Sequence, residues 1–292
     1  MNDFVRSLLS LLPDRFYLDL QYYSAFRRLP NWRRPVSFNE KIQWLKLYDH
    51  NPAYISLVDK YAVKKIVAKE IGEEHIIPTL GVWDRVEDIE WGVLPEKYVL
   101  KTTHGGGNNG VVICRGINSF DREEAIKKLS AGLRHDSYLY GREWPYKYIH
   151  RRIIAEQLIE PRFNTQDLPD YKWYCFNGVP KYCQVIQNRS TKETIDFFDT
   201  EWRHQEFIGL NPNAIHSQEP PSCPPNLGVH LQIARKLSKN IPFSRIDLYE
   251  TGDNTYFGEI TLYPNSGLGQ FSPKQYGNQF GQMIVLPIKT RK

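Results

Sequence analysis

The sequence has no hydrophobic run long enough to cross a bilayer, few cysteines, and only a small excess of charge of one sign. The cysteines lack CxxC spacing, so they indicate neither a cysteine zinc site nor a disulfide framework; they are Cys114, Cys175, Cys183 and Cys223. Reduced thiols are typical of the cytoplasm, and we predict a cytoplasmic protein. The excess of 38 Lys and Arg over 33 Asp and Glu suits a nucleotide, a polyanionic substrate or an anionic membrane face. It is too small to indicate a nucleic-acid partner.

The composition is that of a folded protein. Hydrophobic residues make up 41%, aromatic residues 13% and charged residues 24% of the chain, which excludes an intrinsically disordered sequence. The 292 residues are enough for two or three lobes with substantial cores.

The first residues form a short apolar segment, from Phe4 to Leu12, that predicts an amphipathic helix ending at Pro13. It begins beside Asp3 instead of a basic region, so a signal peptide is not indicated. An aromatic and basic stretch follows, from Tyr22 to Arg34. Two interpretations remain open: peripheral contact with the inner face of a membrane or with an assembly partner, and packing of the helix on its own protein.

A glycine cluster follows the apolar strand that ends at Lys101. The segment 98–114 predicts a strand, a loose glycine loop and a second strand, and it lacks the Gly-Lys-Ser/Thr ending of a Walker A site. Glycines permit close backbone approach, successive N–H groups bind anions, and a lysine adds a point charge. The segment therefore predicts a lid over a nucleotide, and the alternative is an ordinary hairpin turn.

The segments around this loop alternate between helical and extended patterns. Ser37 and Glu40 have the spacing of a capping box, which predicts a helix start. A second helix is predicted from Leu57 to Glu70, a strand near 76–83, and a third helix from Asp121 to Leu133. A buried strand then begins at Ile153, and its end could offer main-chain groups to an adenine and a carboxylate to a ribose. The alternative is a solvated strand end.

A lysine in the middle of a predicted strand gives a second candidate for phosphate contact. Alternation places Lys172, Tyr174 and Phe176 on one face of this strand. A lysine in a sheet interior is costly unless it meets an anion. Asn177-Gly178 predicts a type I′ turn and a returning strand.

The two strands near the carboxyl end carry acidic side chains that could be neighbours. Arg245 and Asp247 share one face of the first strand, and Glu259 lies on the second. A hairpin would bring Asp247 beside Glu259, and paired carboxylates near a phosphate loop are suited to Mg²⁺. Arg245 could stabilise charge on a transferring phosphoryl group. The alternative is an ion-pair network within the sheet.

Together these segments resemble the ATP-grasp superfamily, and more closely the TupA-like ATP-grasp proteins of bacterial surface-polysaccharide gene sets. The resemblance covers about residues 35–275, and it is carried by the segments 37–46, 59–61, 101–107, 170–172, 245–249 and 257–261. It implies an α+β fold in which two α+β lobes clasp ATP, preceded by a smaller N-terminal α/β region. We divide the chain into a helical extension (1–35), an N-terminal α/β subdomain (36–95), a small lobe with the glycine lid (96–160) and a large lobe with the magnesium and substrate site (161–292).

The resemblance also implies roles for individual residues. Lys172 and Arg245 would face the γ-phosphate as catalytic residues, and Asp247 and Glu259 would bind Mg²⁺. The set that would bind ATP is Lys101, His104, Gly105, Gly106, Gly107, Glu156, Gln157, Leu158 and Glu160, with Glu160 assigned to the ribose. Thr261 stands where many ATP-grasp ligases have Asn, which leaves the number of magnesium ions open.

The implied reaction is ATP-dependent carboxylate–amine ligation through an acyl-phosphate. The implied carboxylate is a uronic acid in a saccharide or its precursor, and the implied amine is an amino acid or another amine. An acceptor groove is predicted from aromatic residues, because aromatic faces stack on sugars; they are His104, Tyr138, Tyr140, Trp144, Tyr146 and Tyr148. The alternative for this group is a core between lobes. A sugar-modifying transferase or kinase and a non-catalytic nucleotide-binding module remain alternative functions.

Overall fold

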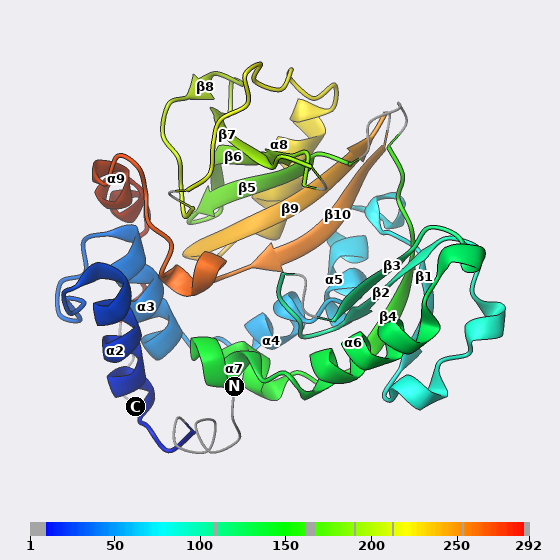
Figure 1. Ribbon diagram of the computed structural model, residues 1–292. Helices are drawn as coiled ribbons and strands as arrows, with labels where there is room; N and C mark the ends of the chain where they lie inside the picture. The colour runs from blue at the N-terminus through cyan, green and yellow to red at the C-terminus, as the bar shows by residue number, and fades with distance from the viewer. Residues whose placement is uncertain are drawn as a thin grey trace.

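Two antiparallel β-sheets with helices packed around them form the framework of the molecule (Figure 1). The computed structural model describes residues 10–107, 110–161, 167–189, 191–211, 213–252 and 254–288. The predictions for most of the N-terminal apolar segment, and for Asn108 and Asn109 in the glycine loop, lie outside the described residues.

The smaller sheet has four strands in the order β1-β4-β2-β3. They are β1 (Thr79–Trp83), β2 (Tyr98–Thr102), β3 (Val111–Cys114) and β4 (Ile153–Gln157). Helix α6 (Arg122–Arg134) packs on this sheet, where Leu129 joins Leu100 and Ala155 in a separate small core. Because β1 pairs with β4, the sheet combines residues from both sides of the boundary predicted at residue 95.

The larger sheet has six strands in the order β10-β9-β5-β6-β7-β8. They are β5 (Asp170–Phe176), β6 (Val179–Gln187), β7 (Thr194–Asp199), β8 (His204–Gln205), β9 (Phe243–Thr251) and β10 (Asn254–Thr261). The turn between β5 and β6 has positive φ at both Asn177 (50°) and Gly178 (81°), which confirms the predicted type I′ turn.

The remaining helices lie on the two sheets or join them. They are α2 (Asp14–Phe26), α3 (Phe38–Tyr48), α4 (Ala53–Val58), α5 (Ala62–Ile71), α7 (Ser137–Gly141), α8 (Leu227–Leu237) and α9 (Gln275–Met283). Ser37 accepts from the backbone of Glu40, and Glu40 accepts from the backbone of Ser37, so the predicted capping box is confirmed. The single helix predicted from Leu57 to Glu70 is wrong. Asp59 interrupts it, because its carboxylate accepts the N–H groups of Tyr61 (2.8 Å) and Ala62 (3.1 Å) and starts α5.

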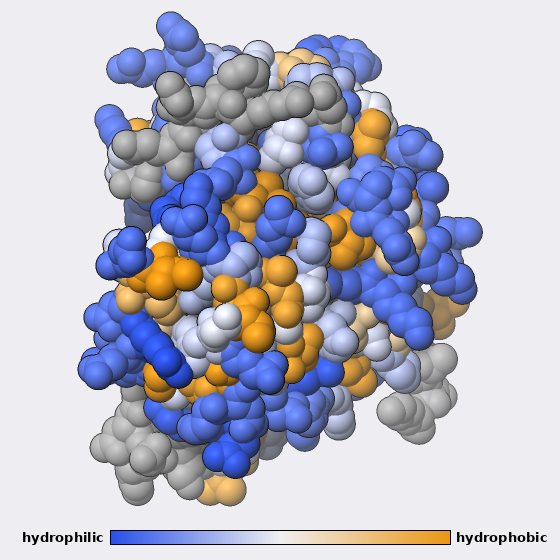
Figure 2. All heavy atoms as spheres, turned by 90° about the vertical axis from the view of Figure 1, so that its right-hand side faces the viewer, coloured by the Kyte–Doolittle hydropathy of each residue, from blue (hydrophilic) through white to orange (hydrophobic). Residues whose placement is uncertain are grey.

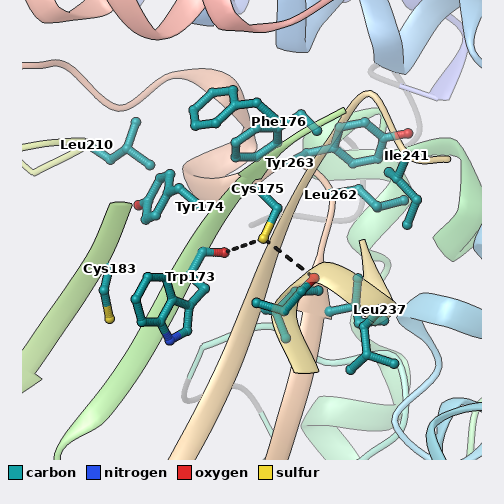
Figure 3. Packing of buried hydrophobic residues seen from close by; sticks show 14 of the residues in the cluster. Trp173, Tyr174, Cys175, Phe176, Cys183, Leu210, Leu237, Ile241, Leu262 and Tyr263 are labelled. Atoms are coloured by element: carbon teal, nitrogen blue, oxygen red, sulfur yellow. Dashed lines mark hydrogen bonds between the residues drawn. The ribbon is translucent and has the colours of Figure 1, made fainter. Parts of the chain in front are cut away.

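The main core lies on both faces of the larger sheet (Figure 3). On one face of β5, Trp173 and Cys175 are fully buried near helix α8, and the Cys175 thiol contacts the carbonyl of Ala234 at 3.8 Å. On the other face, Phe176 packs at right angles to Phe280 of α9. This alternation, predicted from the sequence, leaves Lys172 and Tyr174 pointing away from α8, toward the smaller sheet.

The side of the four-stranded sheet shows no large apolar patch among the residues that the structure describes (Figure 2). The hydrophobic areas in that view are small and separated by polar residues, among the residues drawn in colour (Figure 2). Elsewhere, α2 exposes Phe16, Leu20 and Tyr23, whereas Tyr22 and Trp32 are buried against the protein. Membrane contact and packing on the protein therefore both stay open for this region, in which Tyr22 and Trp32 are packed internally. Within the described part of the chain, no helix has both the length and the apolar character needed to cross a membrane.

Candidate active site

A cavity of about 710 Å³ lies between the two sheets, within the range of ligand sites. Its floor is the face of the larger sheet that carries Lys172, Arg245 and Asp247, and the opposite wall includes Lys101 and the glycine loop. The lobes that flank it come from chain segments far apart in sequence (Figure 1). Most of the residues predicted to act together therefore line one cavity.

The floor places its charged residues in rows that follow strand register. Lys172 of β5 lies opposite Asp247 of β9, and Asp247 lies opposite Glu259 of β10. In the neighbouring row, Arg245 lies opposite Thr261. The predicted pairing of Asp247 with Glu259 across a hairpin is confirmed, while the metal role of the pair is a separate prediction.

Arg245 links both carboxylates of the pair. Its guanidinium donates to Asp247 at 2.7 and 2.6 Å, to Glu259 at 3.2 Å and to Thr261 at 3.1 Å. Lys172 contacts Asp247 and also pairs with Asp170 at 2.8 Å. One oxygen of Asp170, Oδ1, is buried and has no hydrogen-bond partner. Arg189 also pairs with Asp170, at 2.7 Å. The site thus contains three acidic side chains, each paired with at least one cation.

A lysine from the N-terminal part of the chain completes this cluster. Lys60 lies 3.1 Å from Glu259 and donates to the carbonyl of Gly105 in the glycine loop at 2.6 Å. Burial alone would raise the pKa of Glu259, but the charges of Lys60 and Arg245 outweigh it and hold this pKa below its usual range. Lys60 therefore connects the loop to the carboxylate pair, a contact that sequence spacing does not reveal.

Lys101 is paired with the carboxylate of Glu156. The Nζ–Oε2 distance is 2.7 Å, and Lys64 contacts the other oxygen. Burial would lower the pKa of Lys101, but the charge of Glu156 raises it above its usual value; the two lysines likewise lower the pKa of Glu156 against its burial. The carboxylate of Glu156 is thus engaged by two lysines, and the resemblance implies that adenine contacts at the end of β4 are made mostly by the main chain.

The other predicted ATP-binding residues divide into two groups. Gly105, Gly106 and Gly107 line the cavity, as do Gln157 and Leu158 at the end of β4. His104 does not: it is buried, with Nε2 3.1 Å from the carbonyl of His135. Glu160 also lies outside the cavity, exposed and paired with Lys97 at 2.9 Å. The structure does not bring His104 or Glu160 to the other predicted residues.

The aromatic residues predicted to form an acceptor groove do not lie together on the cavity. Tyr146 alone among them lines it. Trp144 is buried and donates to the carbonyl of Asp49 at 3.0 Å, and Tyr138 donates to Asp14 at 2.7 Å. The alternative interpretation, a core between lobes, fits Trp144, whereas Tyr140 and Tyr148 are exposed.

One wall of the cavity is a left-handed turn that the sequence analysis did not assign. It follows β10, and its residues Asn265, Ser266 and Gly267 have φ of 47°, 53° and 67°. Non-glycine residues in this region store conformational strain and need support from their surroundings. Asn265 and Ser266 line the cavity, as does the nearby carboxylate of Glu143.

Helix α3 supplies that support through polar side chains. Asn39 donates to the carbonyl of Gly267 at 3.0 Å, and Gln43 donates to that of Ser266 at 2.9 Å. Lys46 donates to the carbonyl of Ser266 at 2.6 Å and to its hydroxyl at 2.7 Å. The three residues lie three to four positions apart and therefore share one face of the helix. This explains why the segment 37–46 contains buried polar residues.

The burial of His104 predicts a pH effect on stability. Desolvation lowers its pKa to about 4, against 6.5 in the unfolded chain. The unfolded state therefore binds more protons between these values, and stability falls as pH decreases through this window. We expect the burial of His104 to lower the free energy of unfolding by roughly 2–3 kcal/mol at pH 4.5 relative to pH 8.

Urea unfolding of the parent and of His104→Gln at both pH values measures this contribution. The difference between the two proteins isolates His104, because the carboxylates titrate in both. Equal pH dependence of the two proteins would contradict the assignment.

Comparisons with known proteins agree with this architecture. The family model described as TupA-like ATP-grasp matches residues 40–285. No curated protein matches the chain. Three solved structures illustrate the low sequence similarity to enzymes of known structure.

The D-alanine–D-alanine ligase from Bacillus anthracis is 16% identical, with 71% of this chain and 57% of that chain covered and a TM-score of 0.41. The corresponding ligase from Helicobacter pylori is 14% identical, with 85% and 69% covered and a TM-score of 0.42. A RimK domain ATP-grasp protein from Sphaerobacter thermophilus is 12% identical, with 81% and 70% covered and a TM-score of 0.40. The chain therefore spans little more than half the length of the first of these.

The family match covers most of the chain, including all ten strands of the two sheets. The α+β ATP-grasp fold and the family expected from the sequence are both confirmed. The protein belongs to the TupA-like ATP-grasp family.

Proposed function

We propose that the protein is an ATP-dependent, ADP-forming ligase that joins a carboxylate to an amine. The observation that carries this proposal is the row of Lys172, Asp247 and Glu259 with Arg245 beside it, facing Lys101 and the glycine loop across one cavity. Cations on both sides of a carboxylate pair suit a polyphosphate bound through a divalent metal ion.

ATP and Mg²⁺ are the ligands that ATP-grasp membership implies, and the residues of the cavity fit them. Asp247 and Glu259 are adjacent oxygen donors, and the unpartnered Oδ1 of Asp170 is buried on the same floor. Mg²⁺ prefers such hard oxygen donors and keeps positions for phosphate and water. When bound there, it would neutralise charge on the β- and γ-phosphates. Thr261 already shares hydrogen bonds with Arg245 and Glu259, so we do not assign it to a metal.

The ion pairs of the cavity also suggest how ligand binding is accommodated. Lys172 and Arg245 contact Asp247, and Lys60 contacts Glu259. Each cation is thus kept beside a carboxylate, and an unpaired charge would be costly at the buried Asp247. Phosphate oxygens can take over these cations, which leaves carboxylate oxygens for the metal. The same cations would therefore pair with carboxylates before ATP binds and with phosphate oxygens afterwards.

In the proposed reaction, an oxygen of the substrate carboxylate attacks the γ-phosphorus and ADP leaves, giving an acyl-phosphate. The amine nitrogen then attacks the acyl carbon, phosphate leaves, and the nitrogen loses a proton. Arg245 and Lys172 stabilise charge on the transferred phosphoryl group. For the amine we propose the end of the cavity formed by Glu143, Tyr146 and Ser266, where a carboxylate can hold an ammonium group and accept its proton.

For the two substrates we propose a uronic acid of a surface polysaccharide or its precursor, and an amino acid or similar amine. Family membership supports this choice, because TupA-like proteins occur in surface-polysaccharide gene sets. Asn265 and Ser266 add polar groups to this wall of the cavity, and Tyr146 adds an aromatic ring. Such a wall suits a hydroxylated substrate.

The proposal predicts which nucleotide is released. With ATP, Mg²⁺, a uronic acid and hydroxylamine, we expect ADP and a hydroxamate, because hydroxylamine intercepts the acyl-phosphate. Chromatography of nucleotides and the colour reaction of hydroxamates with iron measure the two products. Release of AMP would contradict attack at the γ-phosphate. ADP formed equally well with a carboxyl-reduced sugar would identify a kinase, and UDP released from a nucleotide sugar would identify a glycosyltransferase.

The same assay tests the place proposed for the amine. Hydroxylamine is mostly uncharged at neutral pH and needs no carboxylate to accept a proton. We therefore expect Glu143→Gln to lower turnover with amino acids more than it lowers hydroxamate formation. Equal loss in both assays would mean that Glu143 supports the fold of the cavity instead.

A further inference from the structure

A cluster of two histidines and one aspartate lies at the outer edge of the larger sheet, apart from the cavity. Asp196 is on β7, His204 is on β8, and His216 follows in the connection to α8. Oδ1 of Asp196 is 2.9 Å from Nε2 of His204 and 3.2 Å from Nδ1 of His216. The donor atoms of the three residues all lie within 4.8 Å of one another.

The two nitrogens of His216 both face acceptors. Nδ1 lies 3.1 Å from the carbonyl oxygen of Ile195 as well as near Asp196, and Nε2 lies 3.3 Å from the carbonyl oxygen of Glu206. A neutral imidazole has one N–H, so it can donate to only one of these sides. If Nε2 carries the proton, Nδ1 presents a lone pair to two oxygens. A cation beside Nδ1 would remove that conflict, and the contact to Glu206 is the outer hydrogen bond that orients metal-binding histidines.

Asp196 is fixed in a position that leaves one oxygen available. Its other oxygen, Oδ2, accepts from the hydroxyl of Ser217 at 2.7 Å and from the backbone N–H of Ser217 at 3.2 Å. The side chain is 1% exposed, while those of His204 and His216 are 30% and 27% exposed. A buried, oriented carboxylate beside two histidines open to solvent gives a metal ion both an anchor and a path of entry.

We propose that Asp196, His204 and His216 bind a zinc ion. Zinc–ligand distances of about 2.0–2.2 Å place the donors of a tetrahedral site about 3.3 Å apart, so the two measured separations need only small adjustments. Two imidazoles and one carboxylate suit Zn²⁺ better than Mg²⁺, which prefers oxygen donors alone. Water would take the fourth position.

The site is separate from the cavity but linked to its wall. Ile195 lines the cavity, and the adjacent Asp196 points to the opposite face of β7 because side chains alternate along a strand. The stretch between His204 and His216 carries Gly209 and Leu210, which line the cavity. Zinc would fasten both ends of this stretch to β7. We therefore assign the ion a structural role in holding that wall.

Zinc titration of the tag-free 292-residue chain tests the proposal. After chelator treatment, calorimetry in excess Mg²⁺ should give about one Zn²⁺ per chain, because Mg²⁺ occupies the oxygen sites. His204→Gln and His216→Gln should each weaken zinc binding at least tenfold, since even outer-shell changes cost about 10–100-fold. His150→Gln is the matched control: this exposed histidine also contacts an aspartate, Asp84 at 2.7 Å, but belongs to no three-residue cluster among the described residues. The His150→Gln variant should bind zinc with the affinity of the parent.

Two further readouts keep the test decisive. Zinc should raise the Tm of the parent and not that of His204→Gln, because a ligand that binds only the folded state stabilises it. Cobalt in place of zinc should give visible absorption bands that His204→Gln lacks. Zinc binding of equal strength in the parent and both cluster variants, or no binding to the parent, would overturn the proposal. In the latter case the three residues form a hydrogen-bonded group only.

Discussion

Glu259→Gln is expected to lower turnover by about three orders of magnitude while the protein remains folded. Losing one metal-binding carboxylate removes several kcal/mol of charge stabilisation, and about 4 kcal/mol corresponds to a thousandfold. The side chain is 33% exposed and contacts Lys60 and Arg245. Arg245 keeps Asp247 as a partner, so the variant leaves few charges unpaired.

Asp247→Asn is expected to be at least as damaging, with an added cost in stability. Asp247 is 1% exposed and contacts both Lys172 and Arg245, and truncating one member of a buried ion pair costs about 3–5 kcal/mol. Its Tm must therefore be measured beside its activity. For this reason Glu259→Gln is the cleaner test of the metal role.

The dependence of rate on Mg²⁺ separates a metal site from an ion-pair network. If Glu259 binds the metal, Glu259→Gln requires a higher Mg²⁺ concentration for half-maximal rate. Glu193→Gln serves as the control, because Glu193 also lines the cavity but lies outside the row of Lys172, Asp247 and Glu259, with Arg189 3.9 Å away. A near-normal rate and an unchanged Mg²⁺ dependence in Glu259→Gln would contradict the magnesium assignment. The carboxylates would then belong to an ion-pair network within the sheet.

Local sequence patterns were enough to predict the parts of the site that lie on neighbouring strands. Two-residue periodicity put Arg245 and Asp247 on one face, and a hairpin then fixed Glu259 as the partner of Asp247. The glycine loop after Lys101 was predictable for the same reason, since β2 and β3 are adjacent in sequence and pair directly. Short-range rules determine these contacts, so no tertiary information was needed.

Contacts between distant segments could not be read from such patterns. The pair between Lys60 and Glu259 depends on how the two lobes close over the cavity. His104 follows Lys101 in the same motif, yet the chain turns after β2 and buries it. Asp59 carried a signal that was missed, because an aspartate before a helical run is a frequent N-cap. The cluster of Asp196, His204 and His216 has irregular spacing: β7–β8 pairing brings His204 to Asp196, and a backbone bond from Ile195 to Ile215 brings His216 there.

Lys101→Met is expected to weaken ATP binding by roughly 10- to 150-fold. The change removes a charge-assisted hydrogen bond to phosphate, worth about 1.5–3 kcal/mol. Lys101 lines the cavity 2.7 Å from Glu156, and methionine keeps most of its apolar stem. Glu156 retains Lys64 as a partner, so the fold should survive. Calorimetric titration with Mg·ATP measures the affinity, and the rise in Tm on adding Mg·ATP should shrink in parallel.

Two matched variants show whether this effect belongs to the cavity. Lys64→Met removes the other lysine from Glu156, but Lys64 does not line the cavity, so it should lower stability with a much smaller change in ATP affinity. Glu160→Gln removes an exposed carboxylate paired with Lys97 and should leave ATP affinity unchanged. Weaker binding by Glu160→Gln would instead support the ribose contact predicted from the sequence. Equal ATP affinities of Lys101→Met and the parent would show that the phosphates do not bind beside the glycine loop. Removal of a lysine that contacts a polyphosphate must weaken ATP binding.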